Sequence, residues 1–205
     1  RAGTVGQVCP QGLRLPRVGL QATIATKVLD TVPRFTLALE NAEVTMAMEA
    51  QTYAIAQHAD QKYGLAPYWY HLREVVGVLA EHGHGGVLYQ RIGWLHDVIE
   101  DTPATWETLA TKFGWDVACA VAFVSDAEGH NRKTRKAATV QRWAEHRRQW
   151  ETEGQASWYP MGAVVKVADR IANLRNSIQT RPDKVKMYRG EHKDFREALY
   201  SPGVA

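Results

Sequence analysis

One short segment of the sequence carries a high density of titratable side chains. His96, Asp97, Glu100 and Asp101 fall within six residues of an otherwise apolar stretch. On a helix, His96 and Glu100 share a face, as do Asp97 and Asp101, because residues four apart are neighbours. Such groups are costly to bury unless something pairs with them, and a divalent cation is the economical partner. The segment therefore indicates a metal site.

Another polar group stands alone in an apolar helix further along the chain. Asp169 lies among Val and Ala residues, and Lys166 and Asn173 share its helical face. A carboxylate in such surroundings requires a cation, which is either a metal or Lys166. His71 adds an imidazole at the start of another predicted helix. The two histidines and two aspartates of these segments make a mixed nitrogen and oxygen ligand set, suited to Mn²⁺, Fe²⁺, Zn²⁺ or Mg²⁺.

The segments that position these residues have the periodicity of helices. Apolar residues recur at near-helical intervals, and glycine or proline separates the periodic stretches. No alternating pattern of useful length predicts a strand. We therefore expect an all-α fold, a compact array of short helices, with a loop over 154–160. The predicted helices span 36–61, 71–83, 87–99, 105–114, 115–124, 131–152, 162–178 and 183–199.

The first 40 residues differ in character from the rest. Residues 1–20 are rich in Gly, Pro and Arg without sustained periodicity, which predicts an irregular arm. A short helix is predicted from Ala22 to Leu29, and Pro33 interrupts it. We expect an N-terminal extension over 1–40, one domain over 41–200 and a tail over 201–205.

The composition is that of an ordinary globular protein. Of 205 residues, 45% are apolar and 23% charged, which fits one domain with an extension. No apolar run approaches the roughly 18 residues of a membrane-crossing helix, so we expect no membrane partner. The two cysteines cannot form a disulfide framework, and no signal-peptide pattern opens the sequence, which favours the cytoplasm. The composition leaves oligomerisation open.

The basic residues gather in one stretch of the chain. The formal net charge of +3 suits an anionic small molecule as well as nucleic acid. Two interpretations of the stretch have equal weight: a solvated helix face, or a strip that contacts phosphates. Nucleic acid is disfavoured as a partner, because aromatic residues are not interleaved with the stretch as in an RNA-binding sheet. The basic strip comprises Arg132, Lys133, Arg135, Lys136, Arg142, Arg147 and Arg148.

The motifs, taken in their order along the chain, resemble a known family. The order His71, His96-Asp97, Asp169 resembles the HD-domain phosphohydrolase superfamily. Three longer strings are similar to the RelA/SpoT-type (p)ppGpp hydrolases, and to their stand-alone small members in particular. These strings are Pro-Tyr-Trp-Tyr-His at 67–71, His-Asp-Val-Ile-Glu-Asp-Thr at 96–102 and Lys-Val-Ala-Asp-Arg-Ile-Ala-Asn-Leu-Arg at 166–175. The resemblance covers about residues 42–200.

This resemblance implies an HD-type helical domain and a metal-dependent reaction. The reaction removes the 3′-pyrophosphate of (p)ppGpp and gives GDP or GTP and pyrophosphate. The implied cofactor is Mn²⁺, with Fe²⁺, Zn²⁺ or Mg²⁺ as alternatives, and its implied ligands are His71, His96, Asp97 and Asp169. Glu100 and Asp101 match the catalytic acid pair, which orients the attacking water and moves protons. The implied contacts to the nucleotide substrate are Lys62, Arg132, Lys133, Lys136, Lys166, Asn173 and Tyr188.

Two departures from the family pattern keep other functions open. Lys62-Tyr63 stands where the family commonly has an Arg-Lys pair, so one cation is lost, and the segment 137–160 is longer than its counterpart. One alternative is the same metal centre acting on another nucleotide, such as NADPH, a nucleoside triphosphate or a cyclic nucleotide. A further alternative is a non-catalytic module that binds nucleotides or nucleic acid. The intact Glu100-Asp101 pair argues against this second alternative.

Overall fold

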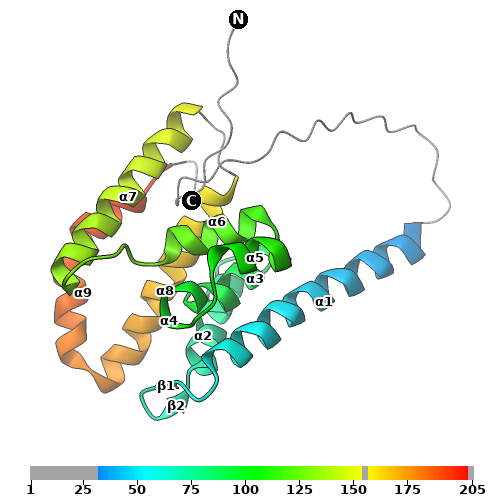
Figure 1. The fold of residues 1–205 in the computed structure, drawn as a ribbon, viewed down its shortest axis with the longest axis horizontal. Coiled ribbons are helices and arrows are strands. Elements are labelled where there is room, and N and C mark those ends of the chain that lie inside the picture. Colours follow the sequence, from blue (N-terminus) through cyan, green and yellow to red (C-terminus); the bar gives the residue numbers. More distant parts are fainter. Residues whose placement is uncertain (1–31, 154–156, 203–205) are drawn as a thin grey trace, which may run out of the picture.

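A long helix, α8 (Trp158–Thr180), runs through the middle of the molecule, and five of the other described helices pack against it (Figure 1). This arrangement comes from a computed structural model that describes residues 32–153 and 157–202, with side chains from residue 41 onward. The predicted all-α fold is confirmed. The predicted arm over 1–20 and short helix over 22–29 lie outside the described residues. No described helix combines the length and apolar character needed to cross a bilayer.

The N-terminal half of the described chain builds one side of the molecule. It contains α1 (Val32–His58), α2 (Trp69–Glu81), α3 (Val87–Leu95) and α4 (Val98–Asp101). α1 packs against α3 and α4, and α2 packs against α3 and α8. Two short strands, β1 (Lys62–Tyr63) and β2 (Ala66–Pro67), pair antiparallel between α1 and α2. They are too short to produce an alternating pattern, so the sequence did not predict them.

The C-terminal half encloses α8 from the other side. α5 (Trp106–Phe113) and α6 (Trp115–Val124) are followed by α7 (Arg132–Glu153), α8 and α9 (Pro182–Leu199). Thr105 is the N-cap of α5, and its hydroxyl accepts a hydrogen bond from the Thr108 amide at 3.3 Å. Gly114, at a φ of +89°, allows the sharp change of direction between α5 and α6.

Several of the predicted helix boundaries are wrong. The helix predicted over 36–61 spans Val32–His58, so it begins before Pro33 and ends three residues early. The helix predicted over 87–99 is broken at residues 96 and 97. The His96 side chain donates to the Gly93 carbonyl, which a continuous helix would pair with the Asp97 amide. The predicted loop over 154–160 is also too long, because α8 already begins at Trp158. Pro160 is tolerated in its first turn, where a backbone amide has no helical partner.

Large aromatic side chains hold α7 against the rest of the core. Trp143 of α7, Phe123 of α6 and Trp158 and Tyr159 of α8 are all at most 1% exposed. The Trp143 indole donates to the Phe123 carbonyl at 2.9 Å, which satisfies a polar group that burial would otherwise leave unpaired. α7 is otherwise highly polar, so this contact sets where its basic residues lie.

Gly162 allows α6 and α8 to approach each other closely. A Cβ atom at this position would lie 2.7 Å from Cδ1 of the buried Phe123 and 3.3 Å from the Ala120 carbonyl oxygen. We predict that Gly162→Ala lowers the free energy of unfolding by about 1–3 kcal/mol, because the core must shift to admit the methyl group. Urea denaturation followed by circular dichroism measures this change.

Gly190→Ala on α9 is the matched control, because no atom lies within 4 Å of its added Cβ. This control should gain up to about 1 kcal/mol from the helix propensity of alanine. An equal gain in both variants would contradict close packing of α6 on α8.

Candidate metal centre

Three separate segments bring four predicted metal ligands to one point. His71 lies in the first turn of α2, His96 and Asp97 form the break between α3 and α4, and Asp169 lies in the middle of α8. Because α2 packs against both α3 and α8, the three segments meet inside the molecule. His71, His96 and Asp169 are buried, and Asp97 is only 14% exposed.

The ligand atoms lie within a few ångströms of one another. His71 Nε2 is 3.4 Å from Asp97 Oδ2 and 3.3 Å from Asp169 Oδ1. His96 Nε2 is 2.9 Å from Asp97 Oδ2 and 3.8 Å from Asp169 Oδ1. One ligand atom from each of His71, His96 and Asp97 lies within 4.8 Å of the other two, close enough to share a metal ion. Asp169 lies beside them. The expectation that these four residues converge is therefore met.

The donor set fits a divalent cation. His96 Nδ1 donates to the Gly93 carbonyl at 2.8 Å, so the other ring nitrogen, Nε2, is the one that can bind a metal ion. Although Nε2 lies near Asp97, it is buried without a hydrogen-bond partner among the described residues. A buried nitrogen acceptor beside carboxylates calls for a cation, and two imidazoles with two carboxylates suit Mn²⁺, Fe²⁺ or Zn²⁺. The identity of the metal is left to the proposal below.

Asp169 has further partners on its own helix. Lys166 Nζ lies 3.3 Å from Asp169 Oδ2, and the Asn173 amide donates to Asp169 Oδ1. The Tyr63 hydroxyl in turn donates to Asn173 Oδ1 at 2.8 Å, and the Tyr63 ring stacks on His71 with centroids 4.7 Å apart. Both alternatives for the Asp169 partner are thus present together, because Lys166 pairs with one oxygen while the other faces the histidines.

The charges at this point shift the pKa values of all the ligands. Burial by itself would lower the pKa of His71, but hydrogen bonding to Asp169 and Asp97 outweighs it and raises the pKa to about 9. Burial would raise the pKa of Asp97 and Asp169, yet the neighbouring cationic groups hold both pKa values below their usual range. Without a metal the site is therefore a cluster of ion pairs that a cation must displace.

The two predicted catalytic acids lie on α4, beside the ligands. Glu100 is exposed, and its Oε2 atom accepts a hydrogen bond from the Asp126 amide at 3.0 Å. Asp101 Oδ2 lies 2.8 Å from the Tyr68 hydroxyl, which also lies 2.7 Å from Asp97 Oδ2. The short helix thus places both acids at the open rim of the metal centre.

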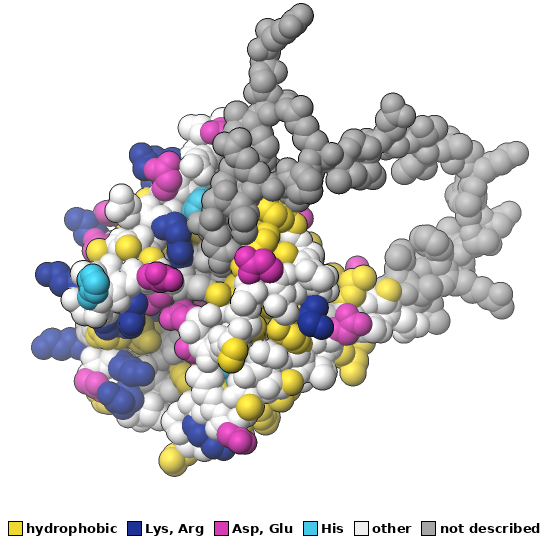
Figure 2. Space-filling view, viewed as in Figure 1, with side chains coloured by type: hydrophobic (Ala, Val, Ile, Leu, Met, Phe, Trp, Pro, Cys, Tyr) yellow, Lys and Arg dark blue, Asp and Glu magenta, His cyan; other side chains and the backbone are white. Residues whose placement is uncertain are grey.

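The basic strip on α7 is divided between two environments. Figure 2 shows Lys and Arg side chains gathered on the side of the molecule where α7 and α9 lie. Arg132 pairs with Glu191 of α9 at 2.8 Å, and Lys133 is exposed. Lys136 instead pairs with Asp126 at 2.8 Å, and Asp126 is the residue whose amide donates to Glu100. Of the strip residues that we expected to contact the nucleotide, Lys136 is thus linked to the acid pair.

The remaining residues that we expected to contact the nucleotide differ in burial and in partners. Lys62 is exposed on β1, and Lys166 is buried. Tyr188 of α9 is half-buried, and the guanidinium carbon of Arg170 lies 4.6 Å from the centre of its ring. Burial raises the pKa of Tyr188, and the nearby charge of Asp169 raises it further. Tyr188 and Asn173 therefore belong to the surroundings of the metal centre.

Sequence reasoning missed two tyrosines that contact the ligands. Tyr63 and Tyr68 each place a hydroxyl or ring against a predicted ligand or its partner. Both occur in strings that we noted for other residues, Lys62-Tyr63 and Pro67-Tyr68. Half-buried tyrosines within a few residues of a predicted ligand were the available signal, because a buried hydroxyl requires a hydrogen-bond partner.

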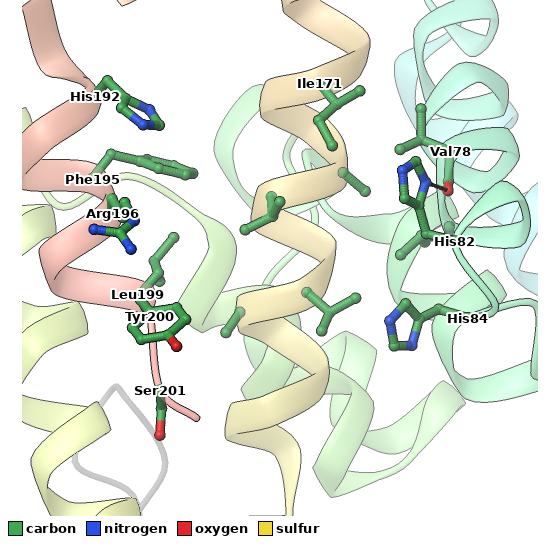
Figure 3. Close-up of a pocket in the computed structure, with 15 residues that line it drawn as sticks. Val78, His82, His84, Ile171, His192, Phe195, Arg196, Leu199, Tyr200 and Ser201 are labelled. Carbon is green, nitrogen blue, oxygen red and sulfur yellow. Dashed lines mark hydrogen bonds between the residues drawn. The ribbon is translucent and has the colours of Figure 1, made fainter. Parts of the chain in front are cut away.

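A cavity of about 350 Å³ lies on another face of α8. Figure 3 shows its lining on both sides of α8, with side chains of α9 on one side and Val78, His82 and His84 on the other. Its lining is mostly apolar, and none of the four predicted metal ligands lines it. The metal centre and this groove therefore share α8 but use different sides of it.

A helical domain in which His, His-Asp and Asp side chains converge from separate segments is the arrangement that we expected for an HD-domain protein. Comparison with known families agrees, because the family model described as "HD domain" matches residues 47–195. The chain belongs to the HD-domain family.

Several known proteins are similar to the chain over most of this domain. It is 31% identical to the Drosophila melanogaster guanosine-3′,5′-bis(diphosphate) 3′-pyrophosphohydrolase MESH1 over 63% of this chain and 68% of that protein. It is 30% identical to the Escherichia coli bifunctional (p)ppGpp synthase/hydrolase SpoT over 74% of this chain, but spans only 20% of that protein. A solved structure described as "a metazoan ortholog of SpoT" that "hydrolyzes ppGpp" has a TM-score of 0.62 and 26% identity, covering 76% of this chain and 86% of the other.

We predict that Asp169→Ala removes metal binding together with any activity. The change deletes one oxygen ligand and leaves His71 without one of its two carboxylate partners. Loss of a residue that only hydrogen-bonds to a metal ligand lowers metal affinity by about 10–100-fold. Loss of a ligand itself should lower the affinity for Mn²⁺ by more than this. Metal analysis after dialysis measures this loss. The exposed Asp183→Ala is the control, and retention of metal by Asp169→Ala would contradict the ligand role.

We also predict that stabilisation by metal increases with pH. The pKa of His71 in the metal-free protein, about 9, is above its ordinary value of about 6.5. Its charge therefore stabilises the metal-free fold fully below about pH 6.5, and this contribution is lost as pH rises through 9. Metal requires the uncharged ring, so bound Mn²⁺ should raise the melting temperature more at pH 9 than at pH 6.5.

Thermal unfolding with Mn²⁺ and with chelator, at both pH values, measures this difference. In His71→Gln the chelator-treated protein should lose most of its pH dependence over this interval. Equal stabilisation by Mn²⁺ at the two pH values would show that the metal does not displace a proton here.

Proposed function

We propose that this protein removes the 3′-pyrophosphate of (p)ppGpp in the cytoplasm, with Mn²⁺ as its cofactor and GDP or GTP and pyrophosphate as products. The observation that carries the proposal is the convergence of two imidazoles and two carboxylates at one buried point, with the acid pair Glu100 and Asp101 at its rim. The names of the Drosophila and E. coli relatives support the choice of substrate.

The ligand residues would hold the cation, and the neighbouring residues would handle water and protons. His71, His96, Asp97 and Asp169 would bind Mn²⁺, which when bound lowers the pKa of water and offsets negative charge on phosphate. Glu100 and Asp101 would take a proton from the attacking water. The water oxygen bonds to the phosphorus next to the ribose, the bond from that phosphorus to the 3′ oxygen breaks, and the proton passes to the 3′ oxygen.

The surroundings of the metal centre would bind the rest of an anionic nucleotide. Lys136, which pairs with Asp126, and Lys62, which is exposed on β1, would contact phosphates. Tyr188, beside Arg170, offers an aromatic face for the base or sugar. Lys166 is already paired with Asp169, so it would favour phosphate binding indirectly, by offsetting the negative charge of that aspartate.

A second candidate is hydrolysis of a phosphate ester on another nucleotide, such as NADPH. The observation that favours it is Tyr63, which stacks on His71 and donates to Asn173. An uncharged side chain thus stands beside the metal centre where the resemblance led us to expect a cation. The loss of one cation weakens the preference for a substrate with a second pyrophosphate group.

A substrate panel with Mn²⁺ tests both candidates. We expect release of pyrophosphate from ppGpp by the metal-loaded protein, and slower turnover by about 10²–10⁴-fold in Glu100→Gln, which keeps the size of the side chain but not its basicity. Metal content should be unchanged in this variant, because Glu100 is not a ligand.

The exposed Glu107→Gln on α5 is the matched control and should keep full turnover. Orthophosphate from NADPH, without pyrophosphate from ppGpp, would establish the second candidate. Failure of the metal-loaded protein to hydrolyse any nucleotide of the panel would refute both.

A further inference from the structure

The hydroxyl of Tyr68 lies between a predicted metal ligand and a predicted catalytic acid. Its oxygen is 2.7 Å from Asp97 Oδ2 and 2.8 Å from Asp101 Oδ2. Asp97 belongs to the ligand cluster, and Asp101 stands four residues later at the end of α4. Among the described contacts, this single hydroxyl is the direct link between the two carboxylates.

The Tyr68 side chain is held firmly in this position. Its ring stacks on the buried His58 with centroids 4.3 Å apart and nearly parallel planes. Its amide donates to the Gln61 carbonyl at 3.0 Å, and its carbonyl accepts from the His71 amide at 2.9 Å. The residue is thus fixed at both its backbone and its ring immediately before α2 begins, so the hydroxyl is presented in one place.

Asp101, in contrast, has little else to hold it. It is exposed at the end of a helix of one turn, and an exposed carboxylate in such a place rotates freely into water. A tyrosine hydroxyl has one proton and donates one strong hydrogen bond at a time, while carboxylates only accept.

We propose that Tyr68 is a positioning residue that orients Asp97 for metal binding and holds Asp101 over the metal centre. When Asp97 gives its lone pairs to a cation, the Tyr68 hydroxyl directs its hydrogen bond to Asp101 instead. Metal binding therefore draws Asp101 toward the metal centre. The part of this inference that concerns Asp101 rests on the proposed hydrolytic function. The orientation of Asp97 affects metal affinity and does not depend on that function.

Tyr68→Phe tests the inference because it removes both hydrogen bonds and keeps the ring that stacks on His58. We expect the dissociation constant for Mn²⁺, measured by isothermal titration calorimetry, to increase by about 10-fold or more, the range found for lost partners of metal ligands. We expect kcat on the hydrolysed nucleotide to fall by a similar factor with KM changed little. Tyr70→Phe is the control, because this nearby tyrosine is exposed and its ring faces Arg73.

A double-mutant cycle with Asp101→Asn separates positioning from a general loss of structure. If Tyr68 acts through Asp101, Tyr68→Phe should reduce kcat much less in the Asp101→Asn background than in the wild type. Asp101→Asn alone should leave Mn²⁺ affinity within about twofold, since Tyr68 still orients Asp97. Asp101→Asn leaves Tyr68 in place, so it tests the contact between the two residues even if Tyr68→Phe is unstable.

Two results would overturn the inference. One is unchanged Mn²⁺ affinity in Tyr68→Phe, a result that does not depend on any substrate. The other is additive loss of kcat in the double mutant, which would mean that the two residues act independently. If no nucleotide is hydrolysed, the proposed function fails, and the calorimetric measurement still decides the role of Tyr68 toward Asp97.

Discussion

The structure depends on the electrostatic problem of holding two aspartates and two histidines inside a helical core. Isolated charges in such a place are expensive, and the interaction of imidazole with carboxylate compensates only when the geometry is good. The shifted pKa values of His71, Asp97 and Asp169 show how strongly each group relies on the others. A divalent cation bound there, as proposed, would compensate the charge of both carboxylates and accept the lone pairs of both imidazoles.

The central helix α8 carries this arrangement. Its Asp169 face meets α2 and the α3–α4 turn, while Gly162 near its start lets α6 approach closely. Different sides of α8 therefore have different surroundings. One side carries Asp169, another packs closely against α6, and a third lines the apolar groove. Because a rigid core transmits small shifts, changes in the packing of α8 are felt at Asp169.

The rim of the metal centre is built differently from its interior. Interior ligands are buried and tied to several partners, whereas Glu100 and Asp101 are exposed and each depends on one main contact, the Asp126 amide and the Tyr68 hydroxyl. The proton transfer proposed for these two acids requires this exposure. The uncharged Tyr63, packed on His71 beside the metal centre, is the feature on which the second candidate substrate rests.

The sequence by itself determined the helical class, the approximate extent of most helices and the four residues, predicted as metal ligands, that the structure brings to one point. It did so because helical periodicity is local and because polar residues in apolar helices are conspicuous, as at Asp169. It could not determine the break at His96, which arises when a side chain competes for the Gly93 carbonyl. Nor could it separate Lys136, which reaches the acid-bearing rim, from Arg132, which pairs with α9.

Only the tertiary structure decided those points and the roles of Tyr63 and Tyr68. Each rests on contacts between residues far apart in the chain, such as Tyr63 with Asn173 and Tyr68 with Asp97. No periodicity encodes such contacts, because they depend on how whole helices pack rather than on the spacing of residues within one helix.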